Sequence, residues 1–339
     1  MSTPLPISGP LSLGDLLDRA FRLYRARFWP LTLVGAVFLV PVGVLTGFLS
    51  GQSMTSFTDA MEEFSRPGAP PDSLAPMLNL YGASLLQILL LALAMGIAQL
   101  AITAHSIAAL HGETLTLGAS IRAGLRRLLP WIAMSLVQWL AIGGAMIVAY
   151  IPLFCVFFSI GALTASGGAS DALGLASILV IVVISCLTLV GLFAPLIYLL
   201  ARWLVAMPSL VNGAGPVQAL RESWRLTKGN IWRAVLYTFL LYVLSLIITG
   251  LPSMALQWLV TLSLGSRQFA LVAALSQGIA SIINVLWLPL YVAALVLLYY
   301  DLRVRQEGYD LALRIEQLEA EVNPPTAAGP ALSGGGSDA

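Results

Sequence analysis

A short basic amphipathic segment leads into a long apolar stretch three times along this chain. The three segments are LSLGDLLDRAFRLYRARFWP from Leu11, LTLGASIRAGLRRLLPW from Leu115 and GPVQALRESWRLTKGNIWR from Gly215. Each segment meets its apolar stretch at a tryptophan, and these residues are Trp29, Trp131 and Trp232. Because roughly 20 apolar residues are enough to cross the hydrocarbon core of a bilayer, the pattern predicts a membrane protein built from repeated helix pairs.

The charge content supports this prediction. The chain is 58% hydrophobic and 10% charged, whereas soluble domains carry about 25% charged residues. We expect an all-α polytopic bundle of six transmembrane spans with cytoplasmic interfacial amphipathic helices. The spans are placed at about 31–50, 81–108, 131–158, 175–201, 232–252 and 271–300. The second span is rich in alanine and glycine, which predicts close packing against its neighbours.

Basic residues gather on one side of the predicted membrane. They precede span one, separate spans two and three and spans four and five, and follow span six, while only Arg66 and Arg267 fall on the other side. The opposite loop, 51–80, is acidic. The positive-inside rule therefore predicts that both termini are cytoplasmic. No small-residue cleavage site follows the first apolar run, so we expect an uncleaved first span.

The period of the pattern is about 100 residues, which predicts a three-fold internal repeat. The repeat units are about 11–110, 111–202 and 212–305, each with one interfacial helix and two spans. They belong to a membrane domain at 11–320, between a flexible N-terminus at 1–10 and a disordered tail at 321–339. Transporters often contain internal repeats. Two spans per unit give parallel repeats, however, which weakens a transporter reading.

The first amphipathic segment has the clearest helix signals. Ser12 followed by Asp15 predicts a capping box, and Asp18 four residues before Arg22 predicts a stabilising ion pair. We expect such helices to lie in the membrane interface with their apolar sides in lipid and their cations near lipid phosphates. The residues expected to contact anionic lipid headgroups or a protein partner are Arg19, Arg22, Arg25, Arg122, Arg126, Arg127, Arg221, Arg225, Lys228, Arg303 and Arg305. The alternative is that these cations only set topology.

Enzyme chemistry has little support in this sequence. His105 is the one histidine within the predicted spans, and these spans contain no aspartate or glutamate, which argues against a proton-coupled pump. His105 and His111 lack a nearby third ligand, so we expect satisfied interfacial histidines rather than a zinc site. No phosphate-binding loop, dinucleotide fingerprint or nucleophile elbow is present in a plausible context. We expect no catalytic site, no cofactor and no metal, and the net charge of +1 gives no reason to expect nucleic-acid binding.

A transporter or lipid-translocating permease is the alternative function. Pro195 and Pro289 are predicted to interrupt spans four and six, and Pro252 to end span five. Broken helices can line a path through a membrane. The residues that would line it are Gln277, Asn284, Pro195 and Pro289. The competing interpretation is structural kinks and interhelical hydrogen bonds.

Three motifs resemble a bacterial family of six-span proteins, the glycerophosphoryl diester phosphodiesterase membrane-domain family. They are LSLGDLLDRAFRLYRARFWPL, PSLVNGAGPVQALRESWRLTKGNIWR and the exit from the last span, YYDLRVRQEGYDL. The resemblance covers roughly Leu11 to Ile315. In fused members hydrolysis belongs to a separate soluble barrel, which this chain lacks. The resemblance implies an integral membrane module of poorly defined role in the bacterial inner membrane, not a phosphodiesterase. From the basic helices we expect a non-enzymatic module that contacts anionic lipid or a partner protein.

Overall fold

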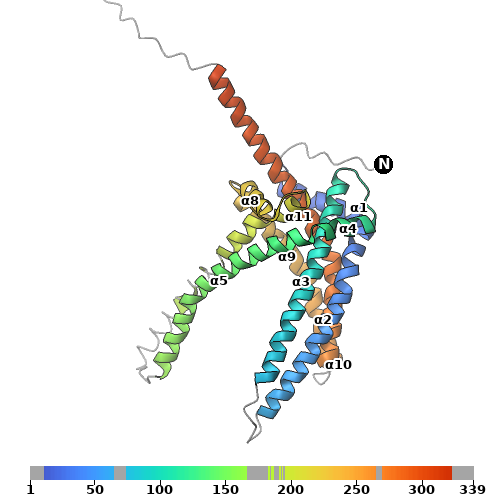
Figure 1. The fold of residues 1–339 in the computed structure, drawn as a ribbon, viewed down its shortest axis with the longest axis vertical. Helices are drawn as coiled ribbons and strands as arrows, with labels where there is room; N and C mark the ends of the chain where they lie inside the picture. Colours follow the sequence, from blue (N-terminus) through green and yellow to red (C-terminus); the bar gives the residue numbers. More distant parts are fainter. Residues whose placement is uncertain are drawn as a thin grey trace, which may run out of the picture.

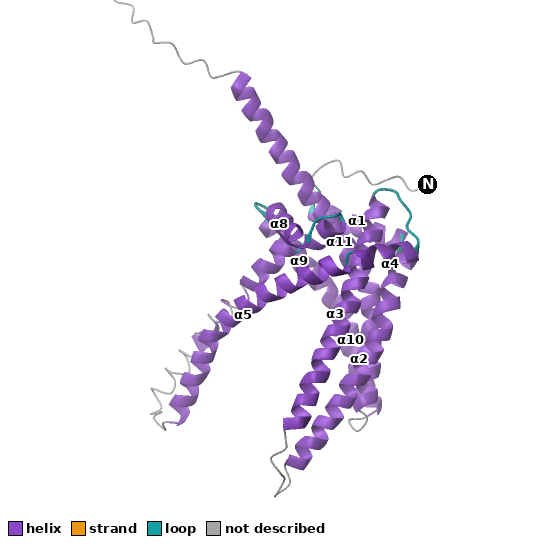
Figure 2. Ribbon diagram, viewed as in Figure 1, coloured by secondary structure: helices purple, strands orange, loops and turns teal. Residues whose placement is uncertain are grey.

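The described part of the chain consists of helices joined by short loops, with no strands. The computed structural model describes residues 11–64, 74–165, 195–264 and 269–322, with a few single positions between 182 and 193. The helices are α1 (Leu13–Ala26), α2 (Phe28–Phe64), α3 (Leu74–Leu110), α4 (Leu117–Arg126), α5 (Leu128–Ala165), α7 (Ala206–Val211), α8 (Pro216–Thr227), α9 (Ile231–Ser245), η1 (Leu246–Gly250), α10 (Leu251–Leu264) and α11 (Phe269–Val322). Figure 1 shows their arrangement, and Figure 2 shows helices joined by short loops.

Five helical segments in these ranges are long and apolar enough to cross a membrane. They are Phe28–Asp59, Leu80–Leu110, Leu128–Val148, Ile231–Leu262 and Ala274–Gln306. They match five of the six predicted spans, which confirms the expected all-α membrane protein. Most of the predicted span at 175–201 lies outside the described residues, as do 1–10 and 323–339. The count of six spans and the repeat therefore stay predictions.

The bundle is centred on α2, α3 and α11, which run side by side (Figure 1). Its core contains Leu31 and Val34 of α2, Ala98 of α3, and Val285 and Val296 of α11, all of them buried. Small residues let the helix backbones approach closely. The predicted close packing of the second span is confirmed, since its alanines at 94, 98, 101, 104 and 108 are all buried.

Helix α5 diverges from this bundle and contacts it mainly near its first turns (Figure 1). Trp131 packs over Gly96 of α3, and Met134 joins a buried cluster. Only 6% of the α5 span is buried inside the protein, against 67% for the last span. Most of the apolar surface of α5 is therefore available to lipid.

Two predicted helix breaks are absent. The fifth span does not end at Pro252, because α9 continues through the π-helical η1 into α10, and that prediction was wrong. The Leu251 N–H donates to the Leu246 carbonyl five residues earlier, and this wider turn accommodates the proline that follows. Pro289 lies inside the unbroken α11, since neighbouring helices can compensate for the hydrogen bond that a proline removes.

The predicted start of the first amphipathic helix is confirmed. The Asp15 N–H donates to Ser12 Oγ over 3.1 Å, and the Ser12 N–H donates to Asp15 Oδ2 over 3.1 Å. Hydrogen bonds from the Ser12 side chain and then its backbone hold the pKa of the Asp15 carboxyl below its usual value. The predicted ion pair four residues apart is present as well, with Arg22 Nη2 2.7 Å from Asp18 Oδ2.

Gly124 provides a test of the packing of α4 on α3. A Cβ at Gly124 would lie 2.9 Å from the backbone nitrogen of Ala101 in α3, so Gly124→Ala forces the two helices apart. We expect it to lower the free energy of unfolding by about 1–3 kcal/mol. The matched control is Gly118→Ala in the same helix, where no atom lies within 4 Å of the added Cβ. Thermal unfolding in detergent should show a lower Tm for Gly124→Ala alone, and equal Tm values for the two variants would contradict this packing.

Candidate functional site

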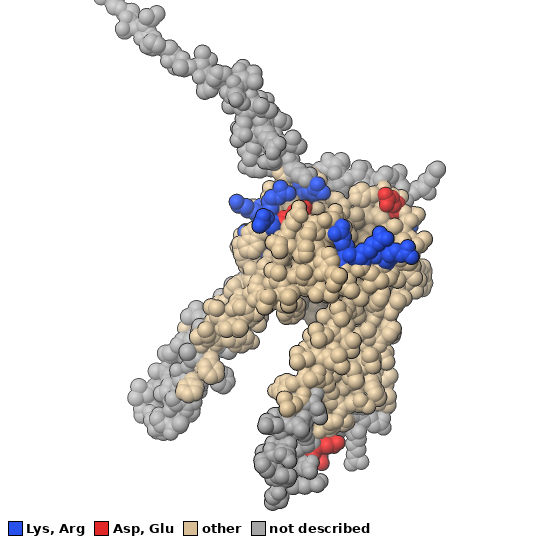
Figure 3. Space-filling model, in the orientation of Figure 1, with Lys and Arg blue, Asp and Glu red and all other residues tan. Residues whose placement is uncertain are grey.

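The three amphipathic helices α1, α4 and α8 lie at one end of the bundle (Figure 1). Helix α1 packs on α11, α4 on α3, and α8 on α5 and α7. Figure 3 shows lysine and arginine side chains gathered at this end on the face in view. We call it the basic end. At the opposite end α2 carries the exposed carboxylates of Asp59 and Glu62.

The amphipathic helices use their apolar faces differently from the prediction. Helix α1 buries Leu16, Ala20 and Leu23, and α8 buries Ala219 and Leu226, all against protein rather than lipid. Small side chains such as Ala20 and Ala219 allow this close approach. The prediction that the apolar faces of these helices lie in lipid was therefore wrong at these buried positions. The fold holds each helix in place, so its polar side has a fixed orientation.

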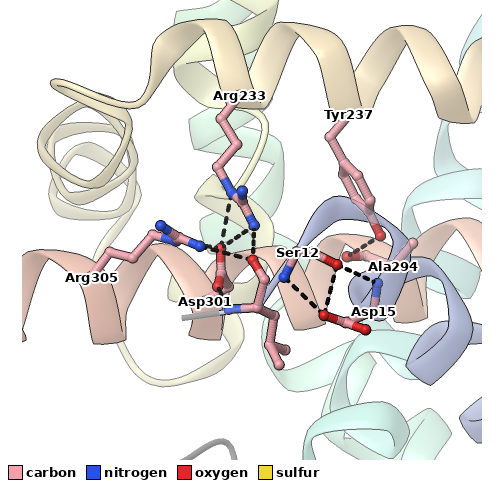
Figure 4. A network of polar contacts seen from close by, with 8 residues as sticks. Ser12, Asp15, Arg233, Tyr237, Ala294, Asp301 and Arg305 are labelled. Carbon is pink, nitrogen blue, oxygen red and sulfur yellow. Dashed lines mark hydrogen bonds and ion pairs between the residues drawn. The ribbon is translucent and has the colours of Figure 1, made fainter. Parts of the chain in front are cut away.

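Asp301 is the polar centre of the basic end (Figure 4). Its side chain is fully buried, and its Oδ1 accepts the Leu11 N–H over 2.8 Å. Its Oδ2 accepts from Arg233 Nε over 3.2 Å and from Arg305 Nε over 3.0 Å. Both guanidinium groups also donate to the Leu11 carbonyl. One carboxylate therefore joins the start of α1 to α9 and α11.

The sequence predictions missed this network. From the sequence, Asp301 was noted only within the exit motif, and Arg233 only within the third basic segment. A usable signal was present, because Arg305 follows Asp301 by one helical turn at the end of a long apolar span. Arg305 was expected to contact lipid or a partner, but its guanidinium is engaged by Asp301 and Leu11.

Arg202 is held at the same end by aromatic side chains. Its guanidinium carbon lies 5.0 Å from the ring centroids of both Tyr198 and Trp224. Its Nη2 donates to the Tyr198 hydroxyl over 2.9 Å, and its carbonyl accepts from Ser223 Oγ over 2.7 Å. Cation–π contacts and hydrogen bonds thus stabilise the docking of α8.

Glu222 links α8 to two further helices. It accepts hydrogen bonds from Ser209 Oγ of α7 and from the Tyr299 hydroxyl of α11, the latter over 3.1 Å. His105 makes a comparable link between α3 and α4, with Nδ1 3.0 Å from Ser120 Oγ. His111 Nδ1 lies 2.9 Å from the Ile107 carbonyl. Within the described ranges, no three His, Cys, Asp or Glu side chains are placed to share a metal ion.

A pocket of about 360 Å³ opens between the ends of α3, α4 and α7. We call it the α3/α4/α7 pocket. Its polar lining comes from His111, Glu113, Arg126, Arg127 and Asn212, and its apolar lining includes Ala104, Ala108 and Ala123. The loop after α7 passes beside it through Gly213, whose φ of +112° favours glycine. A Cβ there would lie 3.6 Å from Arg127 Nη2. Two of the three predicted arginines at α4, Arg126 and Arg127, therefore meet in one concave site, and Arg122 lies outside it.

The other predicted contact residues are more dispersed. Arg25, Arg122 and Lys228 are exposed, Arg19 is partly buried, and Arg22 pairs with Asp18. Arg221 and Arg225 line a shallow groove of about 300 Å³ on α8, together with Gln218 and Glu222. Arg303 follows Asp301 and Leu302 in α11. Each amphipathic helix thus presents at least one exposed arginine.

The residues of the alternative transport path differ in their surroundings. Asn284 Nδ2 donates to the Ala280 carbonyl of its own helix over 2.9 Å. Gln277 and Pro195 are exposed, whereas Pro289 is buried. Neither the α3/α4/α7 pocket nor the α8 groove includes any of them. The path along spans four and six stays a prediction.

Replacement of Asp301 tests whether its network holds the basic end together. Asp301→Asn removes the negative charge and leaves two guanidinium groups uncompensated, so we expect a loss of about 3 kcal/mol in the free energy of unfolding. The control is Asp18→Asn, because that carboxylate pairs with Arg22 in the open, at 57% and 70% exposure, and should contribute at most about 1 kcal/mol. Thermal unfolding in detergent, with limited proteolysis before α1, measures both. A Tm for Asp301→Asn no lower than that of Asp18→Asn would refute this role.

Comparison with known proteins gives one match, to a family of unknown function designated DUF7544, over residues 11–309. The match begins at the Leu11 that bonds to Asp301 and ends beyond Arg305, so it includes the whole network. No curated protein and no solved structure matches the chain significantly. The resemblance to the phosphodiesterase membrane-domain family is not tested by these comparisons and stays a prediction. Because the match covers most of its length, the chain belongs to the family of unknown function DUF7544.

Proposed function

We propose that this protein is a non-enzymatic membrane module that binds anionic lipid headgroups through its basic end. The observation that carries the proposal is the collection of α1, α4 and α8 at one end of an apolar bundle. Each of these helices presents an exposed arginine, namely Arg25, Arg122 and Arg225. A basic residue near an anionic leaflet contributes about 1 kcal/mol of attraction.

The proposed orientation follows from the same charges. Basic segments beside membrane spans are retained on the cytoplasmic side, so the basic end faces the cytoplasm and both chain termini lie there. The acidic end of α2, with Asp59 and Glu62, then lies on the far side of the membrane. The motifs shared with a bacterial membrane-domain family support the bacterial inner membrane as the location.

Fixed helices make this surface suited to headgroup binding. The Asp301 network and the Arg202 stack hold α1 and α8 against the bundle. The exposed arginines therefore keep their positions without bound lipid, which reduces the conformational entropy lost on binding. Arg233 and Arg305 hold α1 against the bundle, while the exposed arginines bind the headgroups of the leaflet.

Neutralising one exposed arginine on each helix tests the proposal. We expect Arg25→Gln, Arg122→Gln and Arg225→Gln together to lower the enrichment of anionic over neutral lipid around the purified protein several-fold, since three attractions of up to about 1 kcal/mol each are lost. Lipid mass spectrometry after extraction in native lipid measures the ratio.

The matched control is the triple lysine variant, Arg25→Lys, Arg122→Lys and Arg225→Lys, which keeps the charge and should keep the enrichment. Equal anionic-lipid content in the glutamine and lysine variants, with both correctly folded, would reject the proposal. Loss of enrichment in both would indicate a surface that recognises guanidinium geometry and would equally contradict charge-based binding.

A further inference from the structure

The cations of the basic end differ in how the fold compensates them. Arg233 and Arg305 pair with Asp301, and Arg22 pairs with Asp18. Arg202 makes cation–π contacts with the rings of both Tyr198 and Trp224. The structure shows no carboxylate within ion-pair distance of Arg126 or Arg127 among the residues it describes, although the two are neighbours in sequence and line the same pocket.

From this arrangement we infer that the α3/α4/α7 pocket is a discrete binding site for a phosphate group. Arginine guanidinium groups present planar pairs of N–H donors that match phosphate oxygens. The Asn212 amide and the His111 ring add polar groups to the same lining, from the residues that directly follow α7 and α3 respectively. Glu113 is the one acidic group of the lining, opposed by two permanent cations, so the pocket keeps a net positive charge.

The shape of the pocket fits a phosphate attached to a small carbon skeleton. Its volume of about 360 Å³ lies within the range of ligand pockets and exceeds what a bare anion needs. Alanines at 104, 108 and 123 keep the space open, and Ile107 and Val211 add apolar surface. The arginines therefore bind the phosphate, while the alanine side accommodates carbon atoms next to it.

Two sources could supply this group, a lipid headgroup or a soluble phosphate ester. The pocket lies beside the last turns of α3, where the membrane-spanning segment ends at Leu110. Binding of a headgroup rests on the proposed function, because it requires the basic end to lie against the leaflet. Binding of a soluble phosphate does not.

The experiment uses the full chain in nanodiscs of phosphatidylcholine. One arm titrates glycerol 3-phosphate by calorimetry, and the other adds phosphatidic acid and counts bound lipids by native mass spectrometry. Two variants attack the pocket: Arg126→Gln with Arg127→Gln removes the cations, and Ala123→Leu fills the space without changing charge. The control, Gly118→Leu, places a leucine at a position of α4 outside the pocket lining, where no atom lies within 4 Å of the added Cβ.

Wild-type protein should bind one equivalent of at least one probe, and both pocket variants should weaken it about tenfold or more, while the control stays within about twofold. The probe that binds identifies the source. The inference is overturned if neither probe binds, if Ala123→Leu binds as the wild type does, or if the control loses as much affinity as the arginine pair. Failure of the lipid-enrichment test with Arg25, Arg122 and Arg225 would leave binding of glycerol 3-phosphate intact, so failure of the proposed function can be distinguished from failure of this inference.

Discussion

A single buried carboxylate organises the basic end. Asp301 lies at the end of a long apolar helix and is fully buried, where an unpaired charge would be strongly unfavourable. It is tolerated because two guanidinium groups and a backbone N–H surround it, and because those guanidinium groups also bond to the Leu11 carbonyl. The start of α1, the start of α9 and the end of the apolar segment of α11 therefore meet at one point, and the position of the first amphipathic helix follows from it.

The same end shows how one residue type serves two purposes. Arg233 bonds to Asp301 of α11, Arg305 to the Leu11 carbonyl just before α1, and Arg202 contacts Trp224 of α8, so these arginines stabilise the docking of helices. Arg25, Arg122 and Arg225 are exposed, so their charges can interact with groups outside the protein. Counting arginines along the chain does not separate these groups, because the difference depends on which carboxylate or aromatic ring lies beside each one in space.

Local signals in the sequence predicted local structure well. The capping box at Ser12, the pair of Asp18 with Arg22, the close-packed alanines of α3 and five of the spans depend on residues that are neighbours in one helix, and the structure confirms them. Contacts between distant segments were not predictable in this way. Leu11 and Asp301 are 290 residues apart, and nothing in their separate surroundings indicates that they meet. Whether the apolar faces of α1 and α8 contact lipid or protein also depends on tertiary packing, since an amphipathic pattern is compatible with both. Similarly, Arg126 and Arg127 were identified as contact residues, but the concave site that they share with Asn212 required the position of α7.

The divergence of α5 from the bundle affects how the protein fits into a bilayer. Figure 3 shows two arms that join near the basic end and separate away from it. The outline of the protein is therefore wider in one leaflet than in the other, and acyl chains must fill the wedge between the arms. Among the described residues, few contacts resist a change in the tilt of α5, since only 6% of its span is buried. Hydrophobic mismatch costs only fractions of a kcal/mol per Å. We therefore expect α5 to change its tilt in a thinner or thicker membrane, while the rest of the bundle keeps its shape.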